Sequence, residues 1–280
     1  MGHHHGHEDA FEGPEEVERV VADGEVALDF VRQVVDLVTG LGGVEVRSIL
    51  DIGSGPGVAT LELARLLPDA TALALDASGS MTEAVRERAA AAGVSDRVDA
   101  RQSEIPDGLD ELSDVDLVWA SMSLHHVGDE RAALRGIRDV LSDDGVLAIL
   151  EFGDQRRLVP VGDEALGDRM EVAFQRFFDD HSQHVWHGDT PSGEIADMVR
   201  ESGLEILSDH VSVVTHELPL DEAQKRYVTG SLQRAARQLE GLLSRKDVKT
   251  LVDLAERSDR PDGPVVVSRR IILARKPRDL

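Results

Sequence analysis

The sequence contains no cysteine. This absence excludes disulfide bonds, thiol nucleophiles and cysteine-based metal sites together, and it agrees with a reducing compartment. The sequence also lacks any run of 18 or more uncharged apolar residues, and its beginning lacks the apolar segment of a signal peptide. We therefore expect neither membrane insertion nor export, and a cytoplasmic location.

Positive charge is scarce. The chain has 54 Asp and Glu against 30 Lys and Arg, a formal net charge of -24, and only four lysines, Lys225, Lys246, Lys249 and Lys276. Because affinity for phosphate backbones and anionic lipids comes mainly from clustered Lys and Arg, we expect no nucleic-acid and no membrane partner. The 280 residues, 41% of them apolar, are enough to bury a substantial core.

Apolar runs and helical patterns alternate along the first half of the chain. Helical spacing over 15–40 predicts one or two N-terminal helices. Strands are then predicted at 46–52, 70–76, 97–102, 115–120 and 144–152, with helices at 57–67, 79–92 and 129–141. This alternation predicts an α/β fold with a doubly wound, mostly parallel sheet and helices on both faces.

The rhythm changes after Phe152. Helices are predicted at 163–187, 191–202, 221–240 and 244–258, and strands at 204–215 and 264–274. No long linker divides the chain, so we expect one unit. Its predicted parts are a His-rich tail with helices (1–45), a ligand-binding core (46–152), a cap or lid insertion (153–203), and a C-terminal part of the core with further cap helices (204–280).

The stretch SILDIGSGPG, residues 48–57, ends an apolar run on Asp51 and then alternates three glycines before a helix. Such a strand-to-helix turn needs glycine because a ligand must approach bare backbone there. The dinucleotide fingerprint G-x-G-x-x-G fails at Val58, and no lysine precedes Lys225 to complete a phosphate-binding loop. An adenosine ligand without pyrophosphate, carrying an ammonium or sulfonium, suits the acidic Asp51 better.

A second carboxylate, Asp76, ends the next apolar strand. At that place it could accept hydrogen bonds from both hydroxyls of a ribose, although an aspartate after a strand is also a common turn former or helix cap. The polar residues 101–106 follow the third strand, where one side chain could reach an adenine edge.

These residues resemble the class I S-adenosylmethionine-dependent methyltransferases. ILDIGSGPG is similar to the family's first motif, and DVDLVWASMSLHHVGDERAALRGIRDVLSDDGVLAILEF is similar to its stretch through strands four and five. The chain departs from the family at Asp143-Asp144-Gly145, where Pro-Gly-Gly is commoner. The resemblance covers residues 46–152 strongly and 204–276 by pattern.

The resemblance implies a seven-stranded sheet whose last strand is antiparallel, S-adenosyl-L-methionine as cofactor, and a cofactor-binding core at 46–152. Met81 stands where the family often packs a side chain on the adenine, and Ser103-Glu104 where Gly-Asp is usual. The implied cofactor-binding residues are Asp51, Gly53, Ser54, Gly55, Gly57, Asp76, Ala77, Met81, Ser103, Glu104 and Ser121.

The resemblance places His125 and His126 beside the methyl-transfer centre, and histidine has an ordinary pKa suited to a general base. Neighbouring side chains on one loop seldom both face one pocket, so we expect at most one to be catalytic, with a slight preference for His126. The alternative is that one or both are packing residues whose nitrogens bond nearby backbone.

Only nine aromatic residues occur, and five of them lie between 174 and 227. These are Phe174, Phe177, Phe178, Trp186 and Tyr227. They favour an apolar substrate pocket under a helical cover, although they could simply hold that cover in place. We expect methyl transfer to O, N or C of a small, partly apolar metabolite of the secondary-metabolism kind. A protein side-chain methyltransferase and a non-catalytic sensor or scaffold are the alternatives.

Three further features have two interpretations each. His181, His184 and His187, with Asp179, Asp180 and Asp189 nearby, could bind a divalent ion, but we favour a moving lid and predict no metal site. His3, His4, His5 and His7 form either a disordered polar tail or an arm that binds a metal or covers the active site. The basic residues between Lys225 and Lys249 form either an ion-paired helix face or a contact for a substrate anion or a second subunit, so a homodimer is possible.

Overall fold

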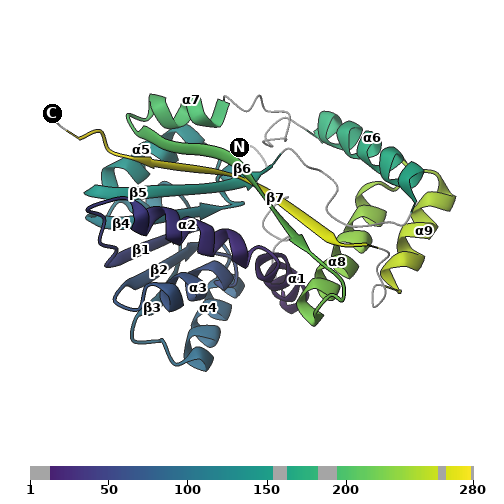
Figure 1. Ribbon diagram of the computed structural model, residues 1–280, viewed down its shortest axis with the longest axis horizontal. Coiled ribbons are helices and arrows are strands. Elements are labelled where there is room, and N and C mark those ends of the chain that lie inside the picture. The colour runs from purple at the N-terminus through teal and green to yellow at the C-terminus, as the bar shows by residue number, and fades with distance from the viewer. Residues whose placement is uncertain (1–12, 154–162, 182–193, 258–262, 279–280) are drawn as a thin grey trace, which may run out of the picture.

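The computed structural model describes residues 13–153, 163–181, 194–257 and 263–278. Across these ranges one seven-stranded sheet carries helices on both faces (Figure 1). Its strands are β1 (Ser48–Ile52), β2 (Thr71–Asp76), β3 (Val98–Gln102), β4 (Val115–Ser121), β5 (Leu141–Phe152), β6 (Glu205–His216) and β7 (Val265–Arg275). The strand order is β3-β2-β1-β4-β5-β7-β6, and only β7 runs antiparallel to its neighbours. The predicted α/β fold with an antiparallel last strand is confirmed.

The helices form two layers on the sheet and a group beyond one edge. Helices α2, α3 and α4 cover one face, α5 and α7 the other, while α1, α6, α8 and α9 lie beyond the carboxyl ends of the parallel strands (Figure 1). Their bounds are α1 (Pro14–Glu25), α2 (Leu28–Gly40), α3 (Val58–Leu66), α4 (Gly79–Ala92), α5 (Glu130–Val140), α6 (Glu164–His181), α7 (Glu194–Glu201), α8 (Glu222–Gln238) and α9 (Arg245–Ala255). No helix in the described ranges is long and apolar enough to cross a membrane.

The central strand β4 shows why the sheet is apolar on both faces. Leu117 and Trp119 join the core on the α2–α4 side, and Val118 and Ala120 join the core on the α5–α7 side. All four are almost fully buried. Each large apolar side chain hidden in this way contributes about 1.5–3 kcal/mol, so the continuous apolar runs of the parallel strands are the main source of stability.

Strand β5 begins earlier than the sequence pattern predicts. It starts at Leu141 instead of 144, with a register shift against β4 between Val115 and Leu117. The irregularity needs Gly145, because a Cβ there would lie 2.5 Å from the carbonyl oxygen of Val115. The Asp-Asp-Gly departure from the family pattern therefore falls within a bulged strand start, and it lies at the opposite end of β5 from the candidate site.

The helices beyond the sheet edge are joined to one another by side chains. Arg169 of α6 donates two hydrogen bonds, of 3.1 and 2.7 Å, to the Asp247 carboxylate of α9. Helix α8 starts with a capping box in which Asp221 and Gln224 each bond the other's backbone. Helix α1 packs on α8, where Glu25 pairs with Arg226 at 2.9 Å. We refer to α6, α8 and α9 as the cap.

Candidate active site

The loop after β1 carries the three alternating glycines in left-handed conformations. Gly53, Gly55 and Gly57 have φ values of 63°, 52° and 77°. A Cβ at Gly53 would lie 2.4 Å from the Ser123 Cβ, and one at Gly57 would lie 2.9 Å from a Val85 methyl. The loop thus needs glycine both for its backbone conformation and for close packing against its neighbours.

Asp76, at the end of β2, braces this loop. Its carboxylate accepts a hydrogen bond from Gly55 N–H at 2.8 Å and another from Ser78 N–H at 2.9 Å. Burial raises the pKa of Asp76, and the two N–H donors oppose that rise. A carboxylate has about four lone-pair sites, so Asp76 keeps acceptor capacity for a ligand at the loop.

Asp51 is a buried carboxyl, 2% exposed, at the end of β1. Thr60 Oγ1 donates to it at 2.5 Å. Burial raises the pKa of Asp51 to about 7, the Thr60 hydrogen bond lowers it, and the neighbouring Asp76 charge raises it further. No basic side chain pairs with Asp51 in the described part of the chain, so a cationic ligand group nearby would favour its ionised form.

The loops after β2 and β3 are tied to the same edge. Ser103 N–H donates to the Asp76 carbonyl at 2.9 Å, and the Gln102 amide donates to the Ala77 carbonyl at 2.8 Å. Met81 is buried in the first turn of α4, whereas Glu104 is exposed. Ser54 joins this network through its N–H, which donates to the Leu75 carbonyl at 3.0 Å.

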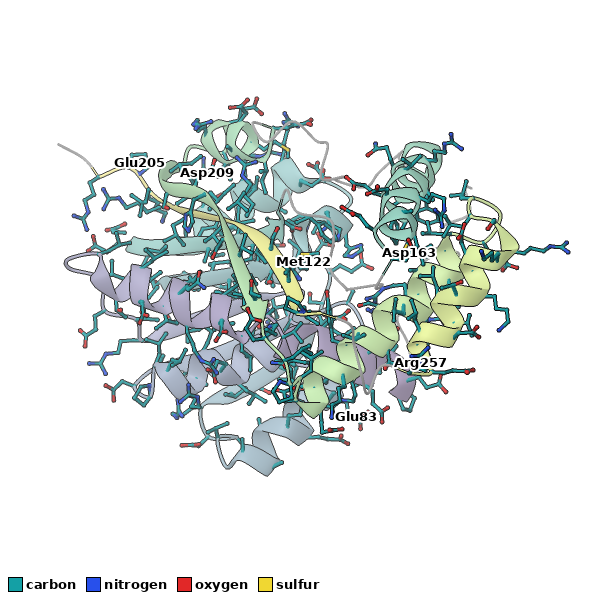
Figure 2. The ribbon with its side chains drawn as sticks, turned by 45° about the vertical axis from the view of Figure 1, so that its right-hand side comes forward. Glu83, Met122, Asp163, Glu205, Asp209 and Arg257 are labelled. Atoms are coloured by element: carbon teal, nitrogen blue, oxygen red, sulfur yellow. The ribbon has the colours of Figure 1, made fainter. Side chains whose placement is uncertain are left out.

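The segment after β4 is strained and polar. Met122 has a φ of 54°, a left-handed backbone conformation that residues other than glycine rarely adopt. Figure 2 shows Met122 where the sheet faces the cap. Next to it, the buried Ser123 hydroxyl has no hydrogen-bond partner among the described residues, although it lies close to Gly53. Ser121, a predicted cofactor residue, is half-buried at the end of β4.

The two histidines differ in their surroundings. His125 is 6% exposed, and its Nδ1 lies 2.7 Å from Glu151 Oε2 at the end of β5. Its ring also lies 4.1 Å from that of His126 and 5.5 Å from that of Phe152, centroid to centroid. His126 is exposed. The structure thus gives His125 a carboxylate partner that fixes its orientation.

The predicted substrate aromatics are only partly described. Tyr227 of α8 is buried in the core, with 4% of its surface exposed, while Phe174 and Phe177 of α6 are half-buried. The side chain of Phe178 and all of Trp186 lie outside the described residues, as do His184, His187 and the N-terminal histidines. The described residues contain no group of three or more side chains that could hold a metal ion.

Several basic residues of α8 and α9 are ion-paired, as the simpler interpretation expects. The pairs are Lys225 with Glu222 at 2.6 Å, Arg226 with Glu25 at 2.9 Å, Arg234 with Asp23 at 3.3 Å, and Lys249 with Asp253 at 2.6 Å. Two of these pairs join the cap to α1. These contacts use the charges within the chain instead of presenting them as one anion site.

Helix α1 covers the glycine loop. A Cβ at Gly55 would lie 3.1 Å from a Val20 methyl. Gly24 of the same helix packs on Val58 at the start of α3, where a Cβ would lie 2.8 Å from the Val58 Cβ. The loop therefore lies under α1, and the same helix also contacts the cap helix α8.

Sequence reasoning overlooked four side chains at this edge. Thr60 and Ser123 are single hydroxyl residues without a recognisable motif. Gln102 stood in the segment noted after the third strand but was not assigned a role. Glu151 did carry a signal, because it ends an apolar strand as Asp51 and Asp76 do.

Residues 49–145 match the family model described as a methyltransferase domain. The 27-O-demethylrifamycin SV methyltransferase of Amycolatopsis mediterranei is 30% identical over 206 residues, covering 69% of this chain and 62% of that one. The trans-aconitate 2-methyltransferase of Rhodococcus jostii is 36% identical over 89 residues, covering 32% of each. The matched regions thus span less than two thirds of these relatives' own lengths.

A solved structure has the same fold. Phosphoethanolamine N-methyltransferase 2 of Haemonchus contortus, solved with phosphomonomethylethanolamine and S-adenosylhomocysteine, has a TM-score of 0.54 and 14% identity, covering 97% of this chain and 60% of that one. At this identity the similarity concerns the fold alone. Residues 49–145 therefore match the methyltransferase domain family, and the chain shares the fold of this solved methyltransferase.

Proposed function

We propose that this chain is an S-adenosylmethionine-dependent methyltransferase that acts on a small, partly apolar acceptor. The observation that carries the proposal is the meeting of the glycine loop, Asp51, Asp76 and the His125–Glu151 pair at one edge of the sheet. The relatives named for a rifamycin and for trans-aconitate support a small-molecule acceptor.

The residues of the loop suit such a cofactor. Gly53 and Gly55 leave the backbone bare, and Asp76 has acceptor capacity left for ribose hydroxyls. Asp51 offers negative charge to a cationic ligand, and the Ser123 hydroxyl, which has no partner among the described residues, offers a further polar contact. No clamp of basic residues is needed, because this ligand has no pyrophosphate.

When bound, S-adenosylmethionine supplies a methyl group on a sulfonium, which is transferred by in-line displacement and depends on the alignment of the reacting atoms. Glu151 accepts the Nδ1 hydrogen of His125, which leaves the lone pair on Nε2. Nε2 can then take a proton from a hydroxyl or ammonium of the acceptor. We therefore favour His125 over His126 as the base, with Glu151 as the residue that positions it.

Calorimetric titration with S-adenosylhomocysteine tests the cofactor part of the proposal. We expect binding to the wild type and about 100-fold weaker binding to Asp76→Ala, because the variant loses the ribose contacts and the brace on Gly55. Asp99→Ala on the neighbouring strand β3 is the matched control, because that carboxylate is exposed and should leave binding unchanged.

Binding that is equally strong in Asp76→Ala and the wild type would remove the ribose role. A wild type that does not bind S-adenosylhomocysteine would remove the proposed function itself. A metabolite extract incubated with isotopically labelled methyl donor then identifies the acceptor and the atom methylated.

A further inference from the structure

Arg269 of β7 is a buried charge that forms no ion pair with an acidic side chain of the described ranges. Arg269 is only 8% exposed. Within the described part of the chain it makes one hydrogen bond, which Nη1 donates to the neighbouring Ser268 carbonyl at 2.8 Å. Its Nε is buried and has no hydrogen-bond partner, and no carboxylate lies within ion-pair distance in the described ranges. Burial lowers the pKa of Arg269, against the opposing effects of Tyr227 and Glu151.

The next residue shows what this arginine lacks. Arg270 presents its Nε and Nη2 to Asp209 of β6, with hydrogen bonds of 2.8 and 2.7 Å to the two carboxylate oxygens. This is the two-pronged arrangement in which a guanidinium matches a carboxylate. In Arg269 the Nη1 atom is used by Ser268, and the same Nε–Nη2 edge has no partner in the described residues.

Leaving a buried guanidinium unpaired destabilises a fold, because the charge loses its hydration and gains no counter-charge. Arginine cannot avoid this by losing its proton near neutral pH. A carboxylate on a ligand would supply both the missing counter-charge and the missing hydrogen-bond acceptor.

Arg269 also lies at the proposed acceptor side of the active site. In the sheet it is paired with Phe152 of β5, whose ring contacts His125, and Phe152 directly follows Glu151. Tyr227 of the cap helix α8 and Asp23 of α1 are close enough to influence the charge of Arg269. The arginine therefore stands between the candidate base and the cap, where an acceptor would enter.

We propose that Arg269 binds a carboxylate group of the methyl acceptor through its Nε–Nη2 edge, so that the enzyme selects acceptors carrying a carboxylate on an otherwise partly apolar body. The inference rests on the proposed function, since it names the class of acceptor for that same site. Tyr227 and the apolar core around it supply the apolar wall.

The test uses simple probes and the full chain. Thermal unfolding is followed with S-adenosylhomocysteine present, with and without benzoate or hexanoate, and with benzamide or hexanamide as uncharged matches. In the wild type we expect the carboxylates to raise the unfolding temperature and the amides to leave it unchanged. Arg269→Met should abolish the carboxylate response, and Arg269→Lys should weaken carboxylate binding at least tenfold, because lysine has no planar fork.

The unliganded variants separate a binding role from a structural one. Arg269→Met should unfold at the same temperature as the wild type or higher, because it removes an unpaired buried charge. Arg270→Met is the matched control: it should lower the unfolding temperature by leaving Asp209 unpaired, and it should keep the carboxylate response. Should Arg269→Met fold poorly, Arg269→Lys still tests the contact.

The two proposals fail in different ways. A wild type that binds S-adenosylhomocysteine but shows no carboxylate response would overturn the role of Arg269 and leave the methyltransferase proposal intact. A carboxylate response that survives in Arg269→Met would also overturn it. Failure to bind S-adenosylhomocysteine would instead count against the proposed function.

Discussion

The two halves of the candidate site are built by different means. The cofactor half, formed by the loops after β1, β2 and β3, uses mainly backbone groups, and Asp76 is held by the Gly55 and Ser78 N–H groups. The acceptor half, formed by Glu151, Arg269 and the cap, uses buried charged side chains, and neither Glu151 Oε1 nor Arg269 Nε has a partner in the part of the chain that the structure describes. Apart from the Ser123 hydroxyl beside Gly53, the cofactor half satisfies its own polar groups within the described residues and is already shaped for one ligand. The acceptor half, with its unpaired groups, still depends on a ligand to satisfy them.

The largest expected effect concerns the His125–Glu151 pair of the acceptor half. His125→Ala should lower turnover about 10²- to 10⁴-fold, because the acceptor's proton loses its base, while affinity for S-adenosylhomocysteine stays unchanged. Glu151→Gln should lower turnover less and shift the pH–rate profile, because the ring loses its carboxylate partner. Rates with labelled methyl donor and calorimetry provide the two readouts.

His126→Ala is the control for this pair, because that neighbouring ring is exposed. We expect it to retain most of the activity. A fully active His125→Ala, or a stronger loss in His126→Ala, would return the role of base to His126 or to a residue outside the pair.

The next effect concerns the backbone design of the cofactor half. Gly53→Ala should destabilise the fold by roughly 3 kcal/mol, because alanine is strained at a φ of 63° and its Cβ would clash with Ser123. Gly42→Ala, in a loop with open space around it, should change stability little. Urea unfolding measures both. Equal stabilities would show that the loop is more adaptable than its geometry indicates.

A smaller effect follows from the carboxyl of Asp51. Since its pKa is about 7, a cationic ligand must displace a proton below that pH, so the dissociation constant of S-adenosylmethionine should rise up to tenfold per unit below pH 7. Binding at pH 7 should release about half a proton, seen by calorimetry in buffers of different ionisation enthalpy. Asp51→Asn should remove the proton release.

The same carboxyl affects the unliganded fold in the opposite direction. Its folded pKa lies above its ordinary value of 3.8, so its contribution to stability is complete below pH 3.8 and is lost as pH rises through 7. At pH 8 the loss amounts to at most about 4 kcal/mol. Unliganded Asp51→Asn should therefore be more stable than the wild type at pH 8, and an equally stable variant would contradict the raised pKa.

The smallest effect is expected at the contact between α1 and the cap. Arg226→Gln removes the ion pair between Arg226 and Glu25. Because the Arg226 side chain is well exposed, the free energy of unfolding should change by less than about 1 kcal/mol. Lys249→Gln, which removes a pair within α9, serves as a comparison. A much larger loss at Arg226 would show that α1 depends on this pair to stay in place.

Local patterns in the sequence predicted the strands and the positions of the loop residues well, while the cofactor-binding role of those residues stays a prediction. The apolar runs gave every strand of the sheet, and Asp51, the glycines and Asp76 lie where the motif implied. Helix and strand ends were less accurate, because the early start of β5 depends on a close approach between Gly145 and Val115 that no local pattern records.

The acceptor half could not be predicted in the same way. Glu151 and His125 are 26 residues apart and meet only through the sheet. Arg269 and Arg270 are adjacent, and alternation places them on opposite faces, but only the fold decides which one faces Asp209 and which one faces the cap. The domain boundaries, the homodimer and the cytoplasmic location stay predictions.

Helix α1 has a practical consequence for anyone trimming this chain. The family match begins at residue 49, yet Val20 and Gly24 rest directly on the loop and on α3. A fragment cut to the matched region would lose helix α1 and expose Val58 to water. Expression of the cofactor-binding part should therefore begin ahead of Pro14, and substitutions at Val20 offer a way to tune ligand exchange without touching any motif residue.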